Sequence, residues 1–383
     1  MKVSQISIGR FHHFHLARQL EKRGMLAALY TGYPRFKLKD EQGIPPGKIK
    51  TFPWLQSPYM MRGRFGLNKW DWLNKEWAWW AHETLDWYVA RNLPKESILV
   101  ALSGSGLHAG KIALKKGGKY VCDRGSSHIR FQDEILKEEY ARWKLSFRGV
   151  DPRSIRKEEK EYELADRITV PSEFVRNSFL SKGVPANKIS KVIYGARLER
   201  FSKIADPENN KFVILWVGGV SIRKGFLYLL QAFQQLKHPN KELRVIGRVS
   251  KDISGLLSNF SLENVNFLGV IPNAKLPEMY STSHVFVLPS LEEGLAMVQG
   301  EALACGCPII SSTNSGAEDL ITSGTEGFIV PVRSVSGLLE SFQQLIDSPA
   351  LRQSMSEAAL KRVHQLGGWD KYGDDYTALL NSL

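Results

Sequence analysis

Two glutamates and the backbone between them are the residues of this sequence best suited to hold a ligand. Glu293 precedes an expected helix, and Glu301 lies eight positions later, about two helical turns along. The apolar run 285–288 predicts a buried strand before them, and Gly306 and Pro308 end the expected helix. The loop residues whose N–H groups become available at the helix start are Gly294, Leu295 and Ala296. Anion-binding N–H groups beside carboxylates indicate a ligand that carries both phosphates and sugar hydroxyls.

Two adjacent cations, Arg223 and Lys224, form a second candidate group. They follow the apolar run 212–217 and a glycine turn that includes Gly219, and they precede Gly225 and an expected helix. Cations at the end of a strand can neutralise the charge that develops on a leaving diphosphate. This is not a Walker loop, because no Ser or Thr follows the lysine.

The elements that must position these groups alternate between strand and helix along the chain. This alternation predicts an α/β fold with two doubly wound, Rossmann-like domains facing across a cleft. A chain of 383 residues is long for one core and sufficient for two. The three cysteines, Cys122, Cys305 and Cys307, are too few for a disulfide framework or a zinc site, so we expect buried or incidental thiols.

The pattern Glu-Gly-x6-Glu that starts at Glu293, followed by Ala-x-Ala-x-Gly-x-Pro, resembles the signature of family-4 retaining glycosyltransferases of the GT-B fold. The resemblance implies that Glu293 lies by the donor sugar and that Glu301 holds the ribose of the nucleotide. It covers residues 165–383 well and residues 1–165 loosely.

The same family has an arginine directly after a glycine, with Lys-Gly a few residues further on. This sequence has Gly219 at the expected arginine position, and the resemblance implies that Arg223, beside Lys224 and Gly225, takes over its role. Two further loops of the family pass near the base and the ribose, and they correspond here to the loops that contain Arg248 and Ile271.

Candidate residues of the first half lie after expected strands. Gly9 and His12 follow the first strand, at a turn where α/β folds place ligands, and we expect them to bind the acceptor. Another strand ends at residues 120–122, where the resembling family carries a histidine that points at the donor sugar. Arg124 occupies that place here and His128 lies four residues on, so either of them is a candidate for this role, and a structural role is an equal alternative.

The resemblance implies three segments: an acceptor-binding domain over residues 1–198, a nucleotide-sugar-binding domain over 199–365, and a helix over 366–383 that crosses back to the first domain. The expected reaction moves a sugar from a nucleotide-diphosphate donor to an acceptor hydroxyl with retention at the anomeric carbon. No Asp-x-Asp metal site stands out, so we expect no metal and no cofactor besides the donor. The alternative is a GT-B-like nucleotide-sugar epimerase or hydrolase.

The charge of the chain is unevenly distributed. Residues 1–200 carry 37 Lys and Arg against 21 Asp and Glu, whereas residues 201–383 carry 15 against 18. A basic half can meet nucleic acid, an anionic membrane or an acidic acceptor, and no nucleic-acid recognition motif is present. We therefore expect a saccharide or lipid-linked acceptor, in cell-surface polysaccharide or glycolipid synthesis, with a possible anionic membrane surface as partner.

The tryptophans of residues 69–87 bear on that membrane prediction. A helical stripe that is expected to face the core contains Trp70, Leu73, Trp77, Trp80 (or Ala81), Thr84 and Trp87. Trp72 and Trp79 lie off this stripe, and exposed Trp near Lys and Arg suits a membrane interface. Without an apolar run of membrane-spanning length or a signal-peptide pattern, the expected location is cytoplasmic, with a peripheral position on the inner face of the membrane left open.

Overall fold

The computed structural model describes residues 2–63, 66–195 and 200–383. Two parallel sheets organise these residues, one in each half of the chain, as the alternation of elements predicted. The first sheet has the order β3 (Ile49–Thr51), β2 (Leu26–Thr31), β1 (Val3–Ser7), β4 (Ile98–Leu102), β5 (Lys119–Asp123), β6 (Arg167–Val170) and β7 (Ile189–Lys191). The second has the order β10 (Val265–Gly269), β9 (Lys241–Ile246), β8 (Phe212–Val217), β11 (Val285–Leu288), β12 (Ile309–Ser312) and β13 (Gly327–Val330). The predicted α/β architecture is therefore confirmed.

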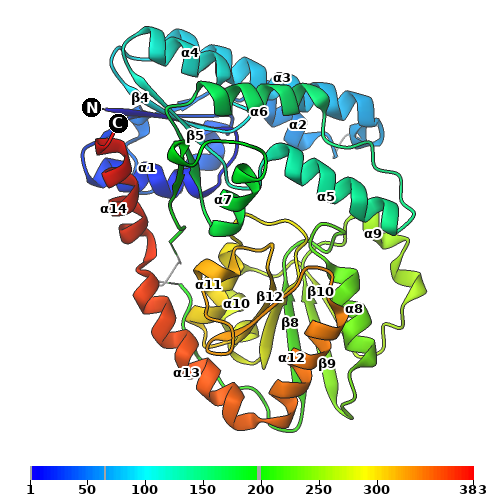
Figure 1. The fold of residues 1–383 in the computed structure, drawn as a ribbon. Helices are drawn as coiled ribbons and strands as arrows, with labels where there is room; N and C mark the ends of the chain where they lie inside the picture. Colours follow the sequence, from blue (N-terminus) through cyan, green and yellow to red (C-terminus); the bar gives the residue numbers. More distant parts are fainter. Residues whose placement is uncertain (1, 64–65, 196–199) are drawn as a thin grey trace.

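Helices connect the strands and cover the sheets (Figure 1). Those of the first half are α1 (His12–Lys22), α2 (Gln56–Met61), α3 (Asp71–Asn92), α4 (Leu107–Lys115), α5 (Ile129–Arg142), α6 (Pro152–Leu164) and α7 (Glu173–Leu180). Those of the second half are α8 (Phe226–Gln235), α9 (Lys251–Ser254), α10 (Leu276–Ser281), α11 (Met297–Ala304), α12 (Val335–Asp347), α13 (Pro349–Leu366) and α14 (Gly368–Asn381). Among the described residues, no helix is both long enough and apolar enough to cross a bilayer.

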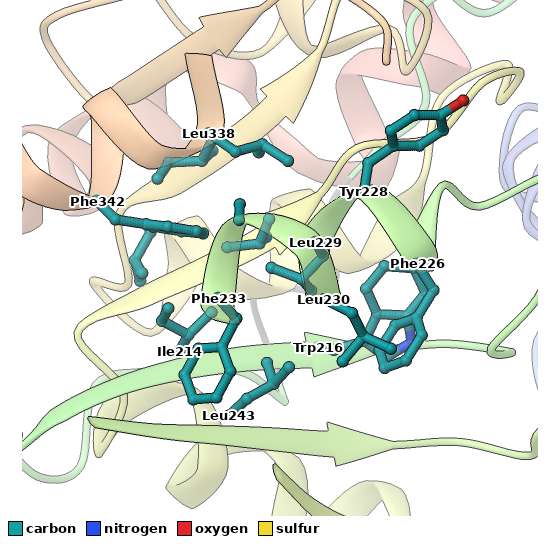
Figure 2. Packing of buried hydrophobic residues seen from close by; sticks show 14 of the residues in the cluster. Ile214, Trp216, Phe226, Tyr228, Leu229, Leu230, Phe233, Leu243, Leu338 and Phe342 are labelled. Atoms are coloured by element: carbon teal, nitrogen blue, oxygen red, sulfur yellow. The ribbon is translucent and has the colours of Figure 1, made fainter. Parts of the chain in front are cut away.

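The core of the second half forms where α8 lies between the sheet and α12 (Figure 2). All six residues of β8 are buried, as expected for a strand of a parallel sheet that is covered on both faces. Phe226 packs edge-on against Trp216, and Phe342 of α12 belongs to the same buried cluster. Burial of a side chain such as Leu or Phe contributes about 1.5–3 kcal/mol, so this packing fixes the end of β8 and the loop that follows it.

The C-terminal helix α14 lies against the first half of the chain. It contacts α1, and Trp369, Tyr372 and Tyr376 belong to the apolar cluster that surrounds β1 and β2. In Figure 1, α13 runs along the second half and α14 continues upward to the first. The predicted domain boundary at residue 198 lies outside the described residues, and the boundary at 365 stays a prediction.

The predicted core stripe of α3 is wrong for three of its tryptophans: Trp70, Trp80 and Trp87 are 54%, 44% and 40% exposed. Ala81, the alternative to Trp80, is buried, and so is Leu85, which the stripe did not include. The helix turns a partly charged face inward, because α6 supplies Lys157 as an ion-pair partner for Glu83 and Asp86, which are also buried. An apolar-periodicity argument cannot anticipate a buried face that contains matched charges.

Candidate active site

The loop after β8 and the loop after β11 lie against each other at the carboxyl ends of their strands. The Leu291 amide donates to the carbonyl oxygen of Arg223 at 2.9 Å. Gly225 has a φ of +73°, and a Cβ there would lie 2.0 Å from the carbonyl oxygen of Pro289. Only glycine meets both requirements without strain, so Gly225 fixes how closely the cation-bearing loop approaches the second loop.

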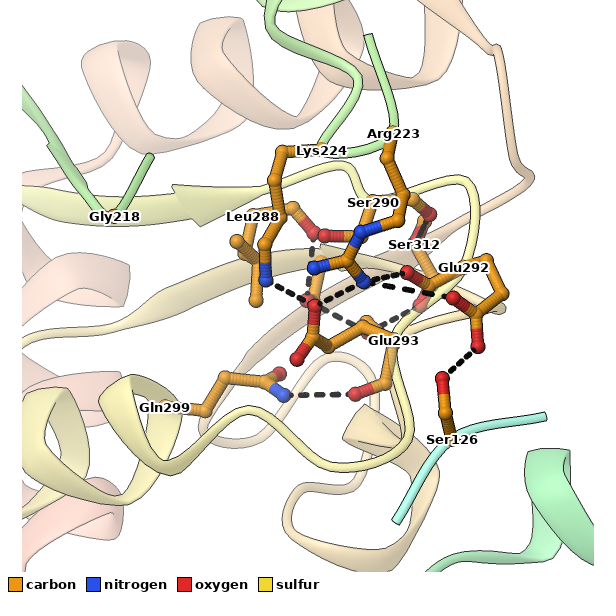
Figure 3. A network of polar contacts seen from close by, with 12 residues as sticks. Ser126, Gly218, Arg223, Lys224, Leu288, Ser290, Glu292, Glu293, Gln299 and Ser312 are labelled. Carbon is orange, nitrogen blue, oxygen red and sulfur yellow. Dashed lines mark hydrogen bonds and ion pairs between the residues drawn. The ribbon is translucent and has the colours of Figure 1, made fainter. Parts of the chain in front are cut away.

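The three charged side chains predicted at this edge meet directly (Figure 3). The Arg223 guanidinium donates to Glu293 Oε2 at 2.9 Å, and the Lys224 ammonium pairs with the same oxygen. Glu293 therefore lies between two cations from the other loop. The side chains of Lys224 and Glu293 are only 16% and 19% exposed, so solvent screens their interaction weakly.

Burial and charge act differently on the two cations. Burial lowers the pKa of Lys224, and the neighbouring Arg223 charge lowers it further, although the Glu293 carboxylate opposes both. Burial also disfavours charged Arg223, but Glu293 and Glu292 more than offset it and raise the pKa of Arg223. At neutral pH the arrangement holds a fixed guanidinium beside a more readily titrated ammonium.

Sequence reasoning missed Glu292, which belongs to the same loop and is completely buried. Its Oε1 accepts hydrogen bonds from the Ser126 hydroxyl and from the Ser127 amide, the latter at 2.8 Å. Its Oε2 accepts from Gln132 at 2.9 Å and lies 3.5 Å from the Arg223 guanidinium. Nothing in the local sequence could reveal these partners, because three of them come from more than 150 residues away.

The start of α11 offers backbone donors beside these charges. Within the described part of the chain, the amides of Gly294, Leu295 and Ala296 donate to no protein acceptor, as the prediction of an anion site requires. Gly294 also touches the first half of the chain: its carbonyl oxygen accepts from Ser172 at 2.6 Å. A Cβ on Gly294 would lie 2.0 Å from the carbonyl oxygen of Gly125.

The other residues predicted to bind the donor differ in their surroundings. Glu301 lies in α11, where it accepts a 3.3 Å hydrogen bond from the buried Tyr280. Gly219 faces open space where a Cβ would be, Arg248 is exposed, and Ile271 is partly buried against an apolar cluster. Their binding roles stay predictions.

Arg124 and His128 are held inside the first half of the chain. Arg124 pairs with Glu158 at 2.7 Å and donates to the carbonyl oxygen of Ser127 at 2.9 Å. His128 is the N-cap of α5, accepts from the Arg130 amide, and has its pKa lowered to about 4 by burial and by the Arg124 charge. These contacts favour the structural alternative for both residues. Backbone and hydroxyl groups of the same loop, rather than these two side chains, meet the second half.

The predicted acceptor residue His12 belongs to a buried cluster. Its Nε2 lies 2.9 Å from Asp123 Oδ2, and the Nε2 of His13 lies 3.0 Å from the same oxygen. The His12 ring also stacks on Tyr194, and Gly9 lies just before the helix that carries both histidines. Burial opposes the charge of Asp123, but the two histidines lower its pKa overall.

The same cluster is the one place in the described residues where three ligand atoms from His, Cys, Asp or Glu lie within 4.8 Å of one another. The Nδ1 atom of His13, the ring nitrogen that does not face Asp123, lacks a hydrogen-bond partner there. Histidine ligands of metals ordinarily donate their second N–H to an acceptor, so this arrangement fits a metal poorly.

The second half of the chain is similar in sequence to known glycosyltransferases. Residues 199–362 match the family model "Glycosyl transferases group 1". The capsular polysaccharide biosynthesis glycosyltransferase CapM of Staphylococcus aureus is 31% identical over 169 residues, which is 43% of this chain and 44% of that protein. A GDP-mannose-dependent monoacylated alpha-(1-6)-phosphatidylinositol monomannoside mannosyltransferase of Corynebacterium glutamicum is 30% identical over 171 residues, 42% of this chain and 44% of the other. These matches thus span less than half the length of either relative.

Solved structures extend the likeness to the whole chain. The Anabaena protein HepE, crystallised with UDP and glucose, aligns with a TM-score of 0.71 at 16% identity and covers 100% of both chains. Sucrose-phosphate synthase from Thermosynechococcus elongatus aligns with a TM-score of 0.68 at 19% identity, over 100% of this chain and 98% of the other. At these identities the likeness establishes the fold. Residues 199–362 therefore resemble the glycosyl transferases group 1 family, and the chain that carries them has the GT-B fold.

Proposed function

We propose that this protein is a retaining glycosyltransferase that moves a sugar from a nucleotide-diphosphate donor to an acceptor hydroxyl. The observation that carries the proposal is the meeting of Arg223, Lys224 and Glu293 beside the free amides that precede α11. The cations and the backbone amides can bind the phosphates of a donor, and the carboxylate can accept hydrogen bonds from its sugar hydroxyls. Both kinds of group lie at the carboxyl edge of one sheet, where α/β folds bind ligands.

The charges suggest how the site would work. A bound diphosphate would compete with Glu293 for Arg223 and Lys224, and the released carboxylate would then accept from hydroxyls of the donor sugar. When the bond between the anomeric carbon and the diphosphate oxygen breaks, negative charge increases on that oxygen. Preorganised cations and amides stabilise such charge more strongly in the transition state than in the ground state, and this difference is what accelerates the reaction.

We propose that these protein cations make a metal ion unnecessary at the diphosphate, so that transfer needs no cofactor besides the donor. Glu301 would bind the ribose, and the loops with Gly219, Arg248 and Ile271 would line the nucleoside. The matched relatives are named transferases, which favours transfer over the alternative of an epimerase or hydrolase.

The acceptor would bind to the first half of the chain, near Gly9 and His12. A saccharide or lipid-linked acceptor, in polysaccharide or glycolipid synthesis, agrees with the names of the two relatives described above. The donor base stays open, since the mannosyltransferase is named for GDP-mannose and HepE was crystallised with UDP.

We also propose that the protein works at the inner face of a membrane. Trp54 and Trp72 are 73% and 68% exposed, and both lie near the basic segment around Arg62. Trp79, the other tryptophan expected to be exposed, is partly covered instead, with the Arg153 guanidinium 5.0 Å from its ring centre. Arg64, the second arginine of the basic sequence Arg62-Gly63-Arg64 that we expect to face the membrane, lies outside the described residues.

A panel of UDP-, GDP- and ADP-sugars tests the proposal. The protein is screened for thermal stabilisation by each donor, and mass spectrometry then follows transfer to saccharide and lipid-linked acceptors. A donor that stabilises the protein and loses its sugar to an acceptor supports the proposal. Hydrolysis or epimerisation of the donor without transfer would favour the alternative function.

A further inference from the structure

Glu292 joins the two halves of the molecule beside the proposed diphosphate site. It lies directly before Glu293, and in Figure 3 its side chain points away from the Lys224 side of the network, toward Ser126. Its carboxylate accepts from Ser126, Ser127 and Gln132 of the first half and faces Arg223 of the second. Its backbone carbonyl oxygen accepts a further hydrogen bond from Arg223 at 2.7 Å.

We propose that Glu292 is a positioning residue that holds the Arg223 guanidinium in its working place only while the two halves are closed on each other. The inference rests on the proposed function, because Arg223 is one of the two cations expected to bind the diphosphate. Glu292 itself would touch neither donor nor acceptor.

A buried carboxylate is suited to this task because it has two acceptor oxygens and no donor. Oε1 is occupied by donors from the loop after β5, while Oε2 faces Gln132 and Arg223. If the halves separate, these hydrogen bonds are lost and the carboxylate stays beside Arg223, drawing the guanidinium away from its contact with Glu293. While the halves are closed, the first half supplies donors to the Glu292 carboxylate, and the Arg223 guanidinium stays in contact with Glu293.

A substitution by glutamine tests whether position 292 requires a carboxylate or only a polar side chain of the same shape. Glutamine has the same shape, but one of its two terminal atoms is an NH2 donor. Since donors approach both oxygens of Glu292, a glutamine must turn its NH2 group toward either the Ser127 side or the Arg223 side. Glu292→Gln therefore breaks the junction on one side without removing side-chain volume.

A second interdomain carboxylate supplies a matched control. Glu139 of α5 is also completely buried, and it accepts from Tyr228 at 2.7 Å and from Arg333 at 2.6 Å, both in the second half. It joins the same two halves but contacts neither Arg223 nor Lys224 in the described structure. Glu139→Gln thus measures how far kcat falls when a contact between the halves is weakened without a direct change at Arg223.

Steady-state kinetics and calorimetry of the full-length protein test the inference. In Glu292→Gln we expect kcat to fall roughly tenfold to a hundredfold, as for a misplaced catalytic group, with the Kd of the nucleoside diphosphate changed less than threefold. Removing both hydroxyls with Ser126→Ala and Ser127→Ala should lower kcat in the same direction, and adding Glu292→Gln to that pair should lower it by less than the product of the separate effects. Equal losses of kcat in Glu139→Gln and Glu292→Gln would overturn the inference, as would a loss of diphosphate affinity that matches the loss of kcat.

Hydrogen exchange gives a readout that needs no turnover. The Ser127 amide donates to Glu292, and the Leu291 amide donates to Arg223. Glu292→Gln should speed exchange of at least one of these amides about tenfold in the ligand-free protein, whereas Glu139→Gln should change neither. Unchanged exchange at both amides would contradict the positioning role. If the wild-type protein transferred no sugar but amide exchange in Glu292→Gln increased as expected, the proposed function would be wrong. The structural role of Glu292 between the two halves would still be supported.

Discussion

Replacement of Lys224 by alanine is expected to lower turnover far more than it weakens binding of the donor. Lys224 lies in a fixed loop, is mostly buried, and pairs with Glu293 at the site proposed for the diphosphate. Mutation of one such preorganised group typically raises the barrier by about 2.7–4 kcal/mol, which corresponds to roughly a hundredfold to a thousandfold in kcat. The loss in binding should be smaller, because Arg223 and the amides before α11 remain.

The pH dependence gives the same prediction a second readout. The ammonium of Lys224 must be protonated to stabilise the diphosphate, and burial lowers its pKa in the free protein. The wild-type kcat/KM should therefore decline on the alkaline side at a lower pH than an ordinary lysine would give. This decline should disappear in Lys224→Ala.

Initial rates at varied donor concentration and pH measure both effects. Lys251→Ala serves as the control, because Lys251 is an exposed lysine of the same half and lies in α9. Turnover of Lys224→Ala near that of the wild-type protein would remove Lys224 from the mechanism. An equal fall in kcat for Lys251→Ala would mean that the effect comes from general charge.

Three further results are expected. Glu301→Gln should chiefly raise the donor KM, because an amide accepts poorly from two ribose hydroxyls, and unchanged nucleotide binding in calorimetry would mark Glu301 as structural. Gly225→Ala should lower the melting temperature and abolish turnover, because a φ of +73° costs a side-chain-bearing residue about 1–3 kcal/mol and its Cβ meets Pro289; wild-type stability would contradict this. The protein should sediment with anionic vesicles at low salt and leave them as salt rises, at about 1 kcal/mol per basic residue near the surface. Trp72→Ala should weaken that binding, and sedimentation with neutral vesicles alone would contradict the electrostatic part.

The candidate site could be predicted from sequence wherever its residues follow strands directly. Arg223, Lys224 and Glu293 come after two neighbouring strands of a parallel sheet, so the fold alone brings them to one edge. The pattern of glycine and apolar residues around Glu293 also predicted a strand, a turn and a helix, and the structure has β11 and α11 there.

Contacts between the two halves could not be predicted in the same way. From the sequence alone, Glu292 is an ordinary loop glutamate. Its hydrogen-bond partners Ser126 and Gln132 lie 166 and 160 residues away in sequence, so only the structure reveals them. The α3 stripe failed for a related reason, because the buried charges of that helix are matched by α6, a partner that periodicity does not reveal.

The most direct test of the account determines the anomeric configuration of the product by NMR, with a donor chosen from the nucleotide-sugar panel and with a metal chelator present. The account predicts a transferred sugar with the same anomeric configuration as in the donor, formed at an undiminished rate with chelator. An inverted product, a rate abolished by the chelator and restored by a divalent metal, or donor consumption without a glycosylated acceptor would contradict it.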